Sequence, residues 1–110
     1  MITEIQKNIG KITDACNRHQ VKTLYLFGSA VRQNDFNKSS DIDFLVEFTY
    51  QYEQTNDSII EQHVKNTDLL KSALESIVQR EVDLLQEKNI SNKFLKYFIN
   101  KEKKLIYGIS

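Results

Sequence analysis

The two stretches LFGSAVR (residues 26–32) and SDIDFLV (residues 40–46) decide the fold of this chain. Each contains an apolar run that favours a strand. In the first, Gly28 ends the run and allows a sharp turn with a close approach of the backbone to a ligand. In the second, Asp41 and Asp43 lie two positions apart, so on a strand their carboxylates point to the same side. Together the stretches predict a turn that can hold a phosphate beside a pair of carboxylates.

The remaining pattern predicts helices around a small sheet. Strands are expected for runs rich in apolar residues at 21–27, 41–48 and 81–86. Helices are expected at 3–19, 29–34, 57–79 and after Ser91, which is a candidate cap. The pattern over 57–79 fits one helix or two with a break near Asn66, and residues 101–106 continue the last helix or form a turn. This alternation predicts an α/β domain with a small sheet flanked by helices.

Composition limits the size and class of the protein. The chain has 110 residues, of which 40% are hydrophobic, so one modest core and a single domain over residues 1–110 are expected. Its 15 basic and 15 acidic residues cancel, so net charge argues neither for nor against nucleic acid. Five lysines lie within 93–104 and predict a solvated face, with contact to an acidic partner or RNA as the alternative.

Two further features concern the cellular compartment. Cys16 is the single cysteine, so no intramolecular disulfide is expected, and its place in an apolar helical stripe predicts a buried thiol. We find no apolar run of transmembrane length and no apolar segment typical of a signal peptide. A cytoplasmic protein without membrane contact is therefore expected.

The aspartates at 41 and 43 are the strongest candidates for chemistry. Two carboxylates on the same side of a strand repel each other, and a hard divalent cation with oxygen ligands is the usual way to offset that repulsion. The alternative is a strand end whose acids face water. The nearby Gly-Ser turn favours the cation, because Ser29 would open a helix whose free N–H groups and dipole attract a phosphate. Taken alone, Gly28 and Ser29 also fit an ordinary helix cap.

Asp83 is the third candidate carboxylate. It lies in the run EVDLL (residues 81–85), where an isolated buried acid is costly unless it is paired or liganded. If this strand lies beside the one with Asp41 and Asp43, the three carboxylates converge. One of them could then bind a metal ion or accept a proton from an attacking hydroxyl. The alternative is an edge strand from which Asp83 faces solvent.

The combined motif resembles the MNT-type proteins, the minimal nucleotidyltransferases of the DNA polymerase beta superfamily. The resemblance rests on LFGS (residues 26–29), Arg32, SDID (residues 40–43) and VDL (residues 82–84), and it extends over almost the whole chain. It implies a polymerase beta-like fold with a small mixed sheet flanked by helices. It also implies ATP as substrate and Mg²⁺ as cofactor.

The resemblance assigns the phosphate-binding residues. Gly28 and Ser29 would hold the triphosphate, and Arg32 would support the phosphates or the short helix of the motif. Gln33 departs from the family, which usually has glycine directly after the arginine. This glutamine would tighten or alter the phosphate loop.

The resemblance also assigns the carboxylates. Asp41 and Asp43 would bind two magnesium ions, and Asp83 would complete the metal site or act as base for the incoming hydroxyl. All three are therefore expected to be both catalytic and metal-binding residues.

An enzyme that transfers AMP from ATP to a hydroxyl is the first functional hypothesis. The chain leaves no room for an acceptor domain, so a partner would supply the acceptor. MNT proteins are commonly paired with a helical HEPN protein, often as antitoxin to a HEPN toxin, which implies a hetero-oligomer and transfer of AMP to a tyrosine of the toxin. Direct nucleic-acid binding is not expected.

Two alternatives do not require transfer. The chain could be a non-catalytic antitoxin that neutralises its partner by complex formation. It could also be the nucleotide-binding subunit of an oligomer with a separate substrate.

Overall fold

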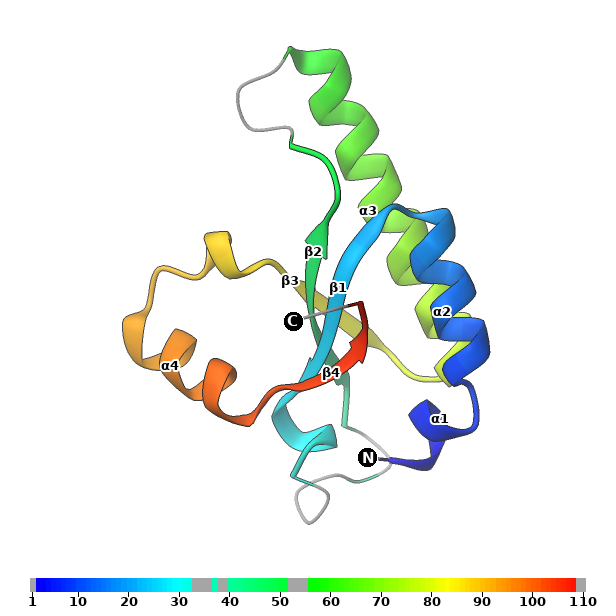
Figure 1. Ribbon diagram of the computed structural model, residues 1–110, viewed down its shortest axis with the longest axis vertical. Helices are drawn as coiled ribbons and strands as arrows, with labels where there is room; N and C mark the ends of the chain where they lie inside the picture. The colour runs from blue at the N-terminus through cyan, green and yellow to red at the C-terminus, as the bar shows by residue number, and fades with distance from the viewer. Residues whose placement is uncertain (1, 33–36, 38–39, 52–55, 109–110) are drawn as a thin grey trace.

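A four-stranded mixed sheet with the strand order β3-β2-β1-β4 is the centre of the computed structural model, which describes residues 2–32, 37, 40–51 and 56–108 (Figure 1). Its strands are β1 (Val21–Phe27), β2 (Ile42–Phe48), β3 (Val82–Leu85) and β4 (Lys104–Tyr107). β1 pairs antiparallel with both β2 and β4, whereas β2 and β3 are parallel. The expected small mixed sheet is confirmed.

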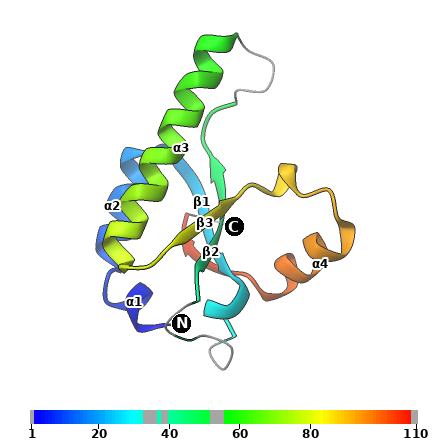
Figure 2. The same cartoon turned by 180° about the vertical axis from the view of Figure 1, so that it is seen from behind.

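The described ranges contain four α-helices around this sheet: α1 (Thr3–Gln6), α2 (Ile9–Arg18), α3 (Asp57–Val78) and α4 (Lys93–Glu102). α2 and α3 lie side by side along one face of the sheet, and α4 lies on the opposite side, as both views show (Figures 1 and 2). Short 3₁₀ turns, η1 (Gly28–Ala30) and η3 (Glu87–Asn89), follow β1 and β3. Among the described residues, no helix is both long and apolar enough to cross a membrane.

Alternation along β2 separates the two faces of the sheet. Ile42, Phe44 and Val46 are buried in the main core, which also contains Leu74 of α3. The residues between them must point to the other face, because side chains of a strand alternate. Leu45 accordingly belongs to a separate small cluster, with Phe27 and Ile99 as its other buried members. This alternation places Asp43 on the face opposite α2 and α3.

The first predicted helix is divided in two. Residues 3–19 contain α1 and α2, separated at Lys7 and Asn8. The Asn8 side-chain amide donates to the Glu4 carbonyl at 2.8 Å, so a side chain replaces a backbone donor at this point. Within α2, Cys16 is fully buried, as expected, and burial raises the pKa of its thiol to about 12.

The long pattern that begins at residue 57 forms one helix, which settles the choice left open by the sequence. Asn56 caps its start, where the side chain accepts a hydrogen bond from the Ile59 N–H at 3.1 Å. Gln79 ends it in a left-handed conformation with φ 59°. All three expected strands are present, each with bounds within one residue of the expectation.

Three expectations near the site were wrong. Asn92, not Ser91, caps α4, because its side chain accepts hydrogen bonds from the Phe94 and Leu95 N–H groups. Residues 101–106 continue the helix only as far as Glu102 and form no turn, since β4 begins two residues later, at Lys104. The helix expected over 29–34 is the single 3₁₀ turn η1 in the part of that range that is described.

Candidate active site

The parallel pairing of β2 with β3 brings two of the predicted carboxylates together. Asp43 and Asp83 are register partners, so the negative charge of Asp83 acts on the Asp43 carboxyl. β3 is an edge strand and Asp83 is exposed, which is the arrangement named above as the alternative. Although Asp83 is exposed, it still lies beside Asp43. The edge position therefore leaves the pair accessible to a ligand.

The electrostatics of Asp43 reflect this pairing. Its pKa is raised from 3.8 to about 6, first by burial, then by the negative charges of Asp83 and Asp41, and then by the hydrogen bond to Asp83. The Arg32 guanidinium acts in the opposite direction. The site is therefore an accumulation of negative charge that a cation would relieve.

Asp41 lies outside the sheet, whereas Asp43 and Asp83 are on paired strands. It lies just before β2 and is exposed, although its charge acts on Asp43. In the described part of the chain, no three His, Cys, Asp or Glu side chains are arranged closely enough to form a ready metal cluster. The repelling carboxylate pair nevertheless fits Mg²⁺, which commonly binds through one or two carboxylates and completes its shell with water and substrate phosphates.

Gly28 packs directly against the carboxylate of Asp43. Its φ is +75°, and a β-carbon at this position would lie 2.5 Å from Asp43 Oδ2. A residue with a side chain would thus be strained and would collide with Asp43. Ser29 follows in η1 and is partly exposed. Because η1 is only one short turn, the helix-dipole argument made for Ser29 does not hold, and the backbone N–H groups of the turn are left as the candidate donors to a phosphate.

Arg32 and the backbone of Gly28 bind the same acidic side chain. The Gly28 N–H donates to Glu102 Oε1 at 3.1 Å, and Arg32 Nη1 donates to Glu102 Oε2 at 2.5 Å. Sequence reasoning missed Glu102, whose one distinguishing signal is that it is an acid within the lysine-rich segment 93–104. The predicted effect of Gln33 falls outside the described residues.

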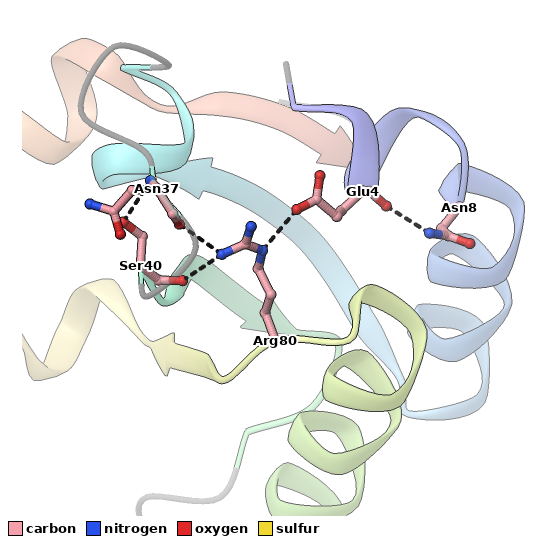
Figure 3. Close-up of polar contacts among 5 residues, drawn as sticks. All are labelled: Glu4, Asn8, Asn37, Ser40 and Arg80. Atoms are coloured by element: carbon pink, nitrogen blue, oxygen red, sulfur yellow. Dashed lines mark hydrogen bonds and ion pairs between the residues drawn. The ribbon is translucent and has the colours of Figure 1, made fainter.

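Arg80 holds the segment that leads into Asp41. Its Nη1 donates to the Asn37 carbonyl at 2.9 Å and to the Ser40 carbonyl at 3.3 Å, and its Nε donates to Glu4 Oε2 at 2.8 Å (Figure 3). Burial alone would raise the pKa of Glu4, but the hydrogen bond and charge of Arg80 hold it below its ordinary value. Arg80 was also missed, since a lone arginine between a helix and a strand has no distinctive pattern.

A cleft of about 610 Å³ extends along the same face of the sheet as Asp43. Leu45 and Glu47, the next residues of β2 on that face, line it together with Tyr25 of β1. Four lysines also line it: Lys22, Lys88, Lys96 and Lys103. The Lys103 ammonium lies 4.2 Å from the centre of the Tyr25 ring. Glu47 and Glu87 also line the cleft and pair with Lys22 and Lys96, and the described lining contains two more lysines than glutamates. This excess of basic side chains favours an anionic ligand.

Comparison with known proteins identifies the family. Residues 10–110 match the family described as polymerase beta, nucleotidyltransferase. The chain belongs to the polymerase beta nucleotidyltransferase family. The resemblance stated from the sequence is thereby confirmed at the level of the family.

Solved structures show the same fold. A protein described as a candidate minimal nucleotidyltransferase has a TM-score of 0.66 and 24% identity, over 90% of this chain and 89% of that one. A toxin–antitoxin structure with AMP-PNP has a TM-score of 0.63 and 22% identity, over 94% and 75%. A structure of tri-AMPylated Shewanella oneidensis HEPN toxin with MNT antitoxin has a TM-score of 0.58 and 20% identity, over 96% and 73%. No curated protein matches the chain in sequence.

Proposed function

We propose that this nucleotidyltransferase transfers AMP from ATP to a hydroxyl of a partner protein. The observation that carries the proposal is the Asp43–Asp83 register pair, with Gly28 packed against Asp43. The turn N–H groups and Arg32 can bind phosphate oxygens, and the carboxylates can bind a metal ion. Together they complement a metal-bound triphosphate. The lysine-lined cleft beside them offers space for the remainder of the substrate.

The proposed step is a single displacement at the α-phosphorus of ATP. The acceptor oxygen forms the new O–P bond, the bond to the β-phosphate oxygen breaks, and pyrophosphate leaves. The hydroxyl proton passes to a carboxylate, for which we propose exposed Asp83. Gly28, Ser29 and Arg32 orient the phosphates and offset negative charge on the leaving group. Asp83 is suited to the proton because it is accessible and lies beside Asp43.

Magnesium is the cation that the donor set fits best. Asp41 and Asp43 would hold it, and Asp83 would complete the site when it does not carry the proton, since all three offer only carboxylate oxygens. When bound, Mg²⁺ would supply positive charge that stabilises the α-phosphate of the transferred AMP and the leaving pyrophosphate. Without a cation, the ionised form of Asp43 is disfavoured, as its raised pKa indicates.

The proposed acceptor is a tyrosine of a HEPN-type toxin, with this chain as its antitoxin in a hetero-oligomer. Support comes from the fold shared with the MNT antitoxin structure that contains AMPylated HEPN toxin and with the AMP-PNP complex.

Incubation with ATP labelled at the α-phosphate, Mg²⁺ and a HEPN partner tests the proposal. Label should appear on the partner and disappear with Asp43→Asn. Asp68→Asn, which removes an exposed carboxylate of α3, is the matched control and should transfer normally. Absence of label with the unmodified chain, or transfer that survives Asp43→Asn, refutes the proposal.

One observation favours the second candidate, an antitoxin that acts by complex formation alone. Glu102 is bound to two of the groups that the enzyme would use for phosphate, Gly28 and Arg32. The double substitution Asp41→Ala/Asp43→Ala separates the candidates. Equal protection from the toxin by the double variant and the unmodified chain would favour binding, whereas loss of protection would favour the enzyme.

A further inference from the structure

Glu102 joins the C-terminal end of α4 to the turn after β1. Both oxygens of its carboxylate are used, one by the Gly28 N–H at 3.1 Å and one by Arg32 at 2.5 Å. The Glu102 side chain is 23% exposed and that of Arg32 is 52% exposed, so the ion pair borders solvent. The contact spans more than 70 positions of sequence, and it is therefore a product of the fold and not of local structure.

The donors that bind Glu102 are those that bind phosphate. A backbone N–H on a glycine turn and an arginine fork are typical donors to phosphate oxygens, and they donate to carboxylate oxygens in the same geometry. Arg32 also acts on the charge of Asp43, so the Glu102 carboxylate and the Asp43–Asp83 pair share one electrostatic environment. A triphosphate at this position would compete with Glu102 for the same hydrogen bonds and would be repelled by its charge.

We propose that Glu102 is an internal ligand of the phosphate site that a nucleotide must displace, and that it thereby sets the affinity of the chain for ATP. The proposal rests on the proposed function, because it requires that Gly28 and Arg32 bind phosphate. Displacement releases the C-terminal end of α4 from η1. Nucleotide binding and the position of α4 are therefore coupled.

A purely structural tie predicts the opposite effect. If Glu102 only fastened α4 to η1, removing its charge would loosen the turn and weaken or leave unchanged the binding of nucleotide. Glu102→Gln distinguishes the two roles, because glutamine keeps the size of the side chain and an acceptor for the Gly28 N–H but loses the charge. Glu61→Gln, an exposed glutamate of α3, is the matched control for charge.

Calorimetric titration with MgATP tests the proposal, and thermal unfolding checks that each variant is folded. Glu102→Gln should bind MgATP about tenfold more tightly than the unmodified chain, because one charge-assisted hydrogen bond no longer has to be broken. Glu61→Gln should bind as the unmodified chain does. Adenosine, which lacks phosphate, should show no gain with Glu102→Gln. Equal or weaker MgATP binding by Glu102→Gln overturns the inference while leaving the proposed function intact.

A second measurement on the unmodified chain does not depend on the variant. Addition of inorganic triphosphate with Mg²⁺ should shift the NMR signals of the Gly28 amide and the Glu102 carboxyl carbon together. A shift of the Gly28 amide with no change at Glu102 overturns the inference. If neither MgATP nor triphosphate binds to any variant, the proposed function itself fails and the inference fails with it.

Discussion

Replacing Asp43 by asparagine is expected to stabilise the metal-free protein while it removes transfer. The asparagine keeps the shape of the side chain and can donate to Asp83, but it carries no charge. It therefore removes both the burial of a carboxylate and its repulsion by Asp83 and Asp41, which together raise the pKa of Asp43 to about 6. Active sites commonly carry such a cost to stability.

The size of the effect follows from the pKa. A shift from 3.8 to about 6 corresponds to about 3 kcal/mol at about 1.4 kcal/mol per unit. Asp43 is only half-buried and solvent screens part of this, so we expect a gain of about 1–2 kcal/mol in the free energy of unfolding. Because the folded state binds the proton more tightly, the penalty is absent in acid and develops as pH rises through the interval from 3.8 to about 6.

Urea unfolding in the presence of a chelator measures this gain. At about pH 8 Asp43→Asn should be more stable than the unmodified chain, and the difference should shrink towards about pH 4. Added Mg²⁺ should stabilise the unmodified chain but not the variant. Asp68→Asn should change stability by less than about 0.5 kcal/mol. A destabilised Asp43→Asn protein, or a difference independent of pH, would refute the reasoning.

Four further substitutions test other parts of the structure by the same unfolding measurement. Gly28→Ala should lower stability by at least about 2 kcal/mol, because φ is +75° and the new carbon would lie 2.5 Å from Asp43 Oδ2. A β-carbon added at Gly10 would meet no atom of another element within 4 Å, so Gly10→Ala should instead raise stability by up to about 1 kcal/mol. A loss of stability with Gly10→Ala would contradict this reasoning about the two glycines. Arg80→Ala should cost about 2–3 kcal/mol and raise the Mg²⁺ concentration needed for transfer, with partial rescue by Arg80→Lys. Leu74 is fully buried, so Leu74→Ala should lower the free energy of unfolding by about 2–5 kcal/mol. An unchanged urea midpoint would argue against the assigned core.

Local pattern was sufficient for the main elements of the fold. β1, β2 and α3 each contain a run whose period matches its structure, and their bounds agree with the expectation to within one residue. The sequence predicted that Asp83 approaches Asp43 only if their two strands are neighbours. The sequence of a strand does not determine which strand lies beside it. The parallel register of β2 with β3 meets that condition.

The errors arose where particular side-chain or long-range contacts, and not the periodicity of the sequence, decide the structure. β4 is four residues long and forms only because β1 offers it an edge. The break between α1 and α2 depends on the Asn8 side chain, which competes with the backbone for a carbonyl. Glu102 and Arg80 were missed for the same reason, since their partners Gly28 and Glu4 lie more than 70 positions away.

The edge position of β3 has a consequence for solubility. An edge strand presents unpaired backbone groups that can pair with a strand of another molecule, and charged side chains on the edge oppose this. The outer strands carry Asp83 on β3 and Lys104 on β4, both exposed. Substitution of Asp83 by an apolar residue would thus remove a proposed catalytic carboxylate and, at the same position, a charge that keeps the sheet from extending into aggregates.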